Sequence, residues 1–105
     1  MLLTKNEVFK TLRLYKDNFL DDGIKIVGLF GSFSRNNADD SSDVDVMIET
    51  TSLFHKRYKG LKAIVKLSEL REFLEEKFQR DVDIVDKKIL LKSNNTHILK
   101  KTIYV

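Results

Sequence analysis

The chain has 105 residues, of which 42% are hydrophobic and 33% charged, a balance that indicates one folded domain over residues 1–105 rather than a disordered segment. It contains no cysteine, which excludes disulfides and thiolate metal sites, and no long apolar run or leader of the kind that enters membranes. With 19 Lys+Arg against 16 Asp+Glu the net charge is +3, which mildly favours anionic partners. We therefore expect a cytoplasmic protein without a membrane-inserted segment.

The first predicted element is a helix over residues 5–20. Thr4 and Glu7 have the spacing of a capping box at its start. Apolar side chains then recur at the intervals of one helix face: Val8, Leu12, Tyr15 and Phe19. The pair Asp22-Gly23 ends this helix, and we expect Asp22 to be a solvated turn residue.

Residues 24–30 are nearly continuous apolar sequence, which predicts a central strand covered on both faces, and Gly28 within them indicates a close approach of another backbone. Gly31 and Ser32 then form a turn that opens a short helix. Backbone N–H groups at such a turn, the Ser32 hydroxyl and the charge of Arg35 can meet an anion. These residues are therefore candidate ligands for the phosphates of a nucleotide, although Ser32 also fits a helix N-cap.

A polar loop over residues 36–42 leads into a second predicted strand over residues 43–49. Side chains alternate between the two faces of a strand, so Asp43 and Asp45 point the same way. Two carboxylates on one rigid face suit a hard cation such as magnesium bound to a triphosphate. A charged edge strand is the structural alternative.

Residues 53–78 have helical spacing of apolar side chains, with a break or kink expected at Gly60. The first half of this segment is basic, which indicates either a solvated face or a site for an acidic protein partner. Direct nucleic-acid binding is not expected, because the basic residues are not arranged with a row of stacking aromatic rings.

Residues 80–86 alternate charged and apolar side chains and predict a third strand that contains Asp83. Short helical or irregular segments follow over residues 87–101, and residues 102–105 complete the sheet as a fourth strand. The expected fold class is α/β (α+β), with a small mixed sheet of about four strands flanked by helices.

Three motifs in this order resemble the signature of the minimal nucleotidyltransferases, small members of the DNA polymerase beta superfamily that are often encoded beside HEPN-type toxins. They are G-S-x-x-R at residues 31–35, S-D-x-D at residues 42–45 and V-D-I-V at residues 82–85. Each motif is weak alone, but the order and spacing together are specific. The resemblance covers nearly the whole chain and implies a polymerase beta-like fold.

The resemblance also implies that Asp83 is the third carboxylate of a magnesium site formed with Asp43 and Asp45. Gly31, Ser32 and Arg35 would then hold the phosphates that leave as pyrophosphate. The implied donor substrate is ATP, and the implied acceptor is a hydroxyl of a partner protein such as a HEPN-type toxin. On this interpretation the chain is an antitoxin that adenylylates its toxin.

Two other hypotheses stay open. The family usually has glycine after the arginine, whereas this chain has Asn36, which motivates an antitoxin that acts by binding alone. A small-molecule nucleotidyltransferase is the second alternative. It would require a homo-oligomer, because a chain of 105 residues is too short to include a separate acceptor domain.

Overall fold

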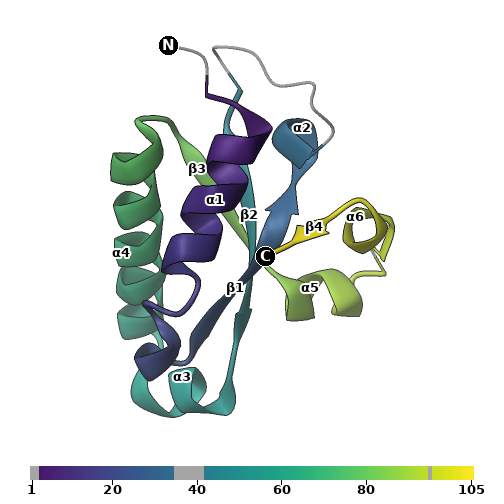
Figure 1. Ribbon diagram of the computed structural model, residues 1–105. Helices are drawn as coiled ribbons and strands as arrows, with labels where there is room; N and C mark the ends of the chain where they lie inside the picture. Colours follow the sequence, from purple (N-terminus) through teal and green to yellow (C-terminus); the bar gives the residue numbers. More distant parts are fainter. Residues whose placement is uncertain (1–2, 35–41, 95) are drawn as a thin grey trace.

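The structure, a computed structural model, describes residues 3–34, 42–94 and 96–105 (Figure 1). Its centre is a four-stranded sheet in the order β3-β2-β1-β4. Strand β1 is antiparallel to both β2 and β4, whereas β2 and β3 are parallel, so the sheet is mixed as predicted. The strand bounds are β1 Ile24–Phe30, β2 Val44–Thr50, β3 Val82–Asp86 and β4 Ile103–Tyr104.

The helices occupy the segments between the strands and before the first of them (Figure 1). Their bounds are α1 Lys5–Tyr15, the 3₁₀ turn η1 Leu20–Asp22, α2 Gly31–Ser34, α3 Ser52–Arg57, α4 Leu61–Phe78, α5 Lys87–Lys92 and α6 Thr96–Lys100. Among the described residues, none of these helices is long and apolar enough to cross a lipid bilayer.

The core lies on one face of the sheet, where α1 and α4 pack against β1, β2 and β3. Alternate residues of β2, from Val44 to Ile48, are buried in it with Leu12 of α1 and Leu70 of α4. Because strand side chains alternate, the odd-numbered residues of β2 face the other side of the sheet, where α5 contacts β2 and β3. This division places the acidic side chains of β2 away from the core.

The structure confirms the predicted start of the first helix and corrects its predicted end. The capping box of Thr4 and Glu7 starts α1 as predicted, but α1 ends at Tyr15 rather than at residue 20. Tyr15 and Phe19 both pack edge-on against Phe73, with ring centroids 5.1 and 5.4 Å away. Their helical spacing is therefore explained by a shared aromatic contact that does not require the helix to continue.

Two glycines are positioned as the sequence indicated. Gly60 has a φ of +59° and separates α3 from α4, which confirms the predicted break. A Cβ atom at Gly28 would lie 2.6 Å from the carbonyl oxygen of Ile103, so β4 can pair with β1 only because that position lacks a side chain. The predicted close backbone approach in β1 is thus the contact with β4.

Candidate active site

Asp45 and Asp83 lie side by side on neighbouring parallel strands. Their Cα atoms are register partners in the ladder between β2 and β3. The residues next to each aspartate in its strand are buried in the core. Val44 and Val46 flank Asp45, and Val82 precedes Asp83. Both carboxylates therefore project from the opposite face, separated by one strand spacing of about 4.8 Å between backbones.

Asp43 immediately precedes β2 and is exposed. The backbone on both sides of it is anchored to the start of β3. The Val44 N–H donates to the carbonyl oxygen of Asp81 at 2.9 Å, and the Arg80 guanidinium donates to the carbonyl oxygen of Ser42 at 3.2 Å. These bonds hold the two acid-bearing strands together at the edge where β2 begins.

Gly31 brings the predicted phosphate-binding turn into contact with the acidic strand. It follows Phe30, which is the register partner of Asp45 in the ladder between β1 and β2. Its φ is +74°, and a Cβ atom added to it would collide with the Asp45 carboxylate. Two conditions therefore favour glycine here: a left-handed backbone and a carboxylate packed against the α carbon.

The remaining predicted phosphate ligands are only partly described. Ser32 lies in α2 directly after Gly31, as the predicted short helix requires. Arg35, and Asn36 after it, lie outside the described residues. Of the predicted phosphate ligands, the structure thus describes the Gly31 turn and the start of α2.

Oxygen donors of this kind suit magnesium, which is usually held by one or two carboxylates together with substrate phosphates. Asp45 and Asp83 provide such a pair on one face, and Asp43 precedes Asp45 by two residues. Within the described ranges, no group of three acidic or histidine side chains is drawn together closely enough to hold an ion by itself. The arrangement therefore fits a cation that is shared with a bound triphosphate.

A pocket of about 370 Å³ adjoins the Gly31 turn and was not anticipated from the sequence. It is formed by Phe30 and Gly31 on one side and by the end of the chain on the other, from His97 to Lys101. His97 is one of the residues that line this pocket. No local pattern links it to Gly31, because the pocket depends on where α6 packs.

The fold and the paired carboxylates define a nucleotidyl-transferring class of protein, and comparison with known families agrees. The chain belongs to the nucleotidyltransferase domain family, whose model matches residues 10–105. The resemblance to the minimal nucleotidyltransferases is confirmed. A solved structure provisionally described as a minimal nucleotidyltransferase superposes with a TM-score of 0.73 over 98% of this chain and 97% of that chain, at 19% identity, which confirms the predicted fold.

Two curated relatives are similar along most of the chain. The protein adenylyltransferase MntA of Thermococcus cleftensis is 29% identical over 105 residues, covering 99% of this chain and 98% of its own. A protein of Methanocaldococcus jannaschii provisionally named a protein adenylyltransferase is 28% identical over 85 residues, covering 80% of this chain and 79% of its own. The protein is therefore a nucleotidyltransferase.

Proposed function

We propose that this protein transfers AMP from ATP to a hydroxyl group of a HEPN-type toxin, in a magnesium-dependent reaction that neutralises the toxin. The observation that carries the proposal is the register pairing of Asp45 with Asp83, with Gly31 packed against Asp45. The name of the Thermococcus relative, which aligns over nearly its full length, supports an adenylyl donor and a protein acceptor.

Each of the six predicted site residues has a role in this proposal. Asp43, Asp45 and Asp83 would hold magnesium, which when bound neutralises charge on the phosphates and on the transferring group. The Gly31 turn, Ser32 and Arg35 would bind the β- and γ-phosphates. His97 and Lys101, across the pocket from Gly31, add polar and positive side chains on the side of the leaving group.

The reaction is an in-line displacement at the α-phosphorus. The acceptor hydroxyl oxygen forms a bond to that phosphorus, while the bond from it to the oxygen bridging to the β-phosphate breaks and pyrophosphate leaves. Asp83 is exposed on an edge strand, which leaves its carboxylate accessible to a hydroxyl from another protein, and in this proposal it would accept the proton. The protein's own contribution is positioning and electrostatic stabilisation.

The acceptor is proposed to be a side chain at the nuclease site of the toxin. Each transferred AMP adds bulk and a phosphodiester negative charge to that side chain. A nucleic-acid substrate is a polyanion, so added negative charge at the toxin's active site would repel it as well as block it sterically.

The direct test is mass spectrometry of a candidate HEPN-type partner protein, after incubation with this protein and Mg-ATP. We expect a mass increase of one or more AMP units with the wild-type protein, and its loss with Asp43→Asn. Asp81→Asn is the matched control, because Asp81 is another exposed acid near the start of β2 and β3. Its backbone carbonyl oxygen contacts β2, so the substitution leaves that hydrogen bond in place. Full neutralisation of the toxin by Asp43→Asn with no mass change would instead establish an antitoxin that acts by binding alone.

A further inference from the structure

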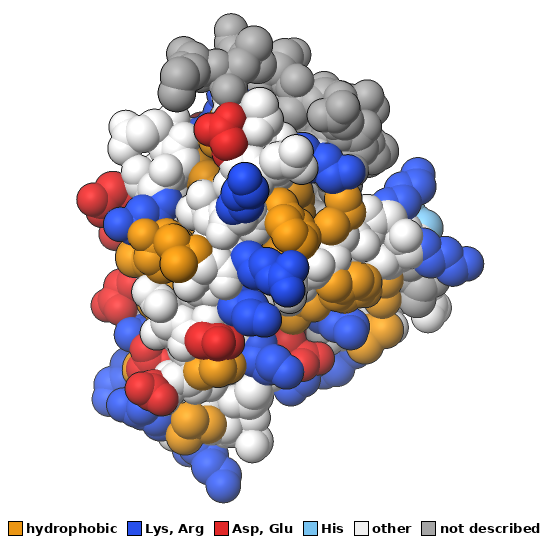
Figure 2. All heavy atoms as spheres, in the orientation of Figure 1, with side chains coloured by type: hydrophobic (Ala, Val, Ile, Leu, Met, Phe, Trp, Pro, Cys, Tyr) orange, Lys and Arg blue, Asp and Glu red, His pale blue; other side chains and the backbone are white. Residues whose placement is uncertain are grey.

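The outer face of α4 exposes large apolar side chains. Leu61, Ile64 and Val65 are 79%, 62% and 56% exposed, whereas Leu70 and Leu74 on the inner face are fully buried. Figure 2 shows hydrophobic and basic side chains together at the lower end of the molecule, where α3 and the start of α4 lie in Figure 1. Apolar side chains gathered in this way commonly mark an interaction surface.

The charges along this helix are segregated. Residues 56–66 carry five Lys or Arg and no acid, whereas residues 69–76 carry four Glu and a single Arg. The helix dipole favours acids in the first turn and bases in the last, yet the first turn of α4 contains Lys62 and no acid, and its last turn contains Glu75 and Glu76 beside a single base, Lys77. The bases in the first turn therefore do not stabilise the isolated helix, whereas they would complement an acidic surface on another element.

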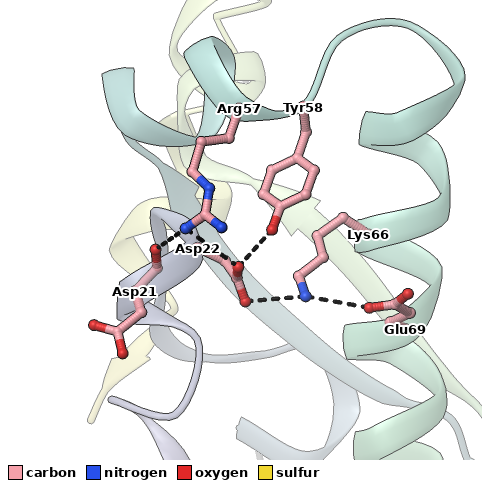
Figure 3. Close-up of polar contacts among 6 residues, drawn as sticks. All are labelled: Asp21, Asp22, Arg57, Tyr58, Lys66 and Glu69. Atoms are coloured by element: carbon pink, nitrogen blue, oxygen red, sulfur yellow. Dashed lines mark hydrogen bonds and ion pairs between the residues drawn. The ribbon is translucent and has the colours of Figure 1, made fainter.

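Some of these charged side chains form ion pairs with other residues of the same chain (Figure 3). The Asp22 carboxylate accepts a hydrogen bond from the Tyr58 hydroxyl at 2.5 Å and lies 3.0 Å from Lys66 Nζ and 3.9 Å from Arg57. Lys66 also pairs with Glu69 at 3.2 Å. The expectation that Asp22 is a solvated turn residue was therefore wrong, because the α3–α4 connection folds back over it.

Other charges on the same surface have no partner of this kind. In the part of the chain that the structure describes, no ion pair joins Lys59, Lys62, Glu72 or Glu76 to another side chain. Lys59 and Lys62 flank Leu61 at the basic end, and Glu72 and Glu76 lie at the acidic end. The apolar side chains at the start of α4 are thus flanked by unpaired bases, one in the helix and one in the turn before it, and are followed along the helix by unpaired acids.

The ridge of Leu61 and Val65 has a groove beside it. A pocket of about 450 Å³ is bounded by both side chains, the Tyr58 ring and Lys62. On the other side of α4, a pocket of about 300 Å³ is formed by Ile64, other α4 side chains and β3. Helices pack by inserting ridges into such grooves, so this surface has the relief of an unfilled helix–helix interface.

We propose that the occupant is a second copy of this chain, whose α4 packs antiparallel to the first about a twofold axis near Val65. In that arrangement the apolar side chains of both copies meet at the axis. Lys62 of each copy then faces Glu69 of the other, and Lys59 faces Glu72. Symmetry forms each contact twice, and antiparallel packing places the basic end of one helix beside the acidic end of the other. Nucleic acid or an anionic membrane would be repelled by the acidic half.

The test is the molar mass of the purified protein in solution, measured by sedimentation or light scattering over a range of concentrations. We expect a dimer whose dissociation constant rises with salt, and a monomer for Val65→Lys. Leu14→Lys is the matched control, since Leu14 is 71% exposed but lies on α1. Circular dichroism confirms that each variant is folded.

A charge exchange tests the orientation of the two helices. Lys59→Glu and Glu72→Lys should each weaken the dimer about tenfold, because each replaces two attractive contacts by two repulsive ones. The double variant should recover the wild-type dissociation constant. A wild-type protein that stays monomeric at its highest soluble concentration, a dimer that survives Val65→Lys, or a double variant no better than the single ones would each overturn the proposal.

Discussion

At the scale of single residues, Gly31 connects the two halves of the candidate site. Its α carbon lies against the Asp45 carboxylate, and its φ of +74° directs the chain into α2. Any side chain there would meet both a backbone penalty and a steric one. The position therefore couples the geometry of the proposed phosphate-binding turn to that of the acidic strand.

We predict that Gly31→Ala abolishes AMP transfer and lowers the free energy of unfolding by more than about 1 kcal/mol, because the new methyl group must displace the Asp45 carboxylate. Thermal unfolding and the mass assay measure the two effects. Gly60→Ala is the control, since Gly60 also has a positive φ but no atom lies within 4 Å of a Cβ placed on it. Full transfer activity in Gly31→Ala would show that the contact with Asp45 is dispensable.

At the scale of elements, the group of polar contacts around Asp22 joins η1 to α3 and α4 (Figure 3). The Tyr58 hydrogen bond, followed by Lys66, lowers the pKa of Asp22, although partial desolvation opposes the shift. The same contacts with Asp22 raise the pKa of Tyr58 and of Lys66. The charged form of Asp22 and the protonated forms of its partners therefore stabilise this junction.

These pKa shifts predict that the free energy of unfolding falls at both low and high pH. The contribution of Asp22 to the free energy of unfolding is complete above its usual pKa of 3.8. It is lost as pH falls through the lowered pKa that Asp22 has in the folded state. The contributions of Tyr58 and Lys66 are complete below their usual pKa values of 10.0 and 10.5 and are lost as pH rises through the raised ones.

Urea unfolding of Asp22→Asn across this range should give a lower stability at neutral pH and a flatter dependence on pH at both ends. Asp21→Asn is the matched control, because Asp21 contacts Arg57 through its backbone carbonyl oxygen rather than its side chain. An unchanged pH profile in Asp22→Asn would show that the contacts do not contribute to folding.

At the scale of the whole molecule, the charge is nearly balanced, with 19 Lys+Arg and 16 Asp+Glu. Arg57 and Lys66 of the basic segment form ion pairs with Asp22. Acidic residues follow the basic segment along α4. Among the described residues of α3 and α4, positive charge is therefore interrupted by acidic side chains instead of forming one continuous strip.

We predict that plain single-stranded or duplex nucleic acid binds weakly, with a dissociation constant in the range of about 10⁻⁴ to 10⁻⁶ M that rises steeply with salt. Fluorescence anisotropy at two salt concentrations measures this, with Lys62→Glu expected to weaken the residual binding further. Tight binding with a sequence preference at physiological salt would contradict the prediction and identify the basic segment as a nucleic-acid surface.

The sequence alone determined the features that depend on neighbouring residues. The apolar run of residues 24–30 predicts β1 with the bounds that the structure shows, and the alternation around Asp45 predicts that this residue faces away from its buried neighbours in β2. Gly60 likewise lies in the break between α3 and α4, directly before α4 begins. Such patterns can be read because strand alternation and helical spacing are set within a few residues.

Only the tertiary structure decided which distant residues meet. The register that pairs Asp45 with Asp83 depends on how α3 and α4 return the chain to the sheet, so their proximity was expected only through the family resemblance and not from local periodicity. The same holds for the contacts of Asp22 with Tyr58 and Lys66, and for the position of His97 beside the Gly31 turn. These contacts join elements far apart in the chain, so they follow from burial of a shared core rather than from any local pattern.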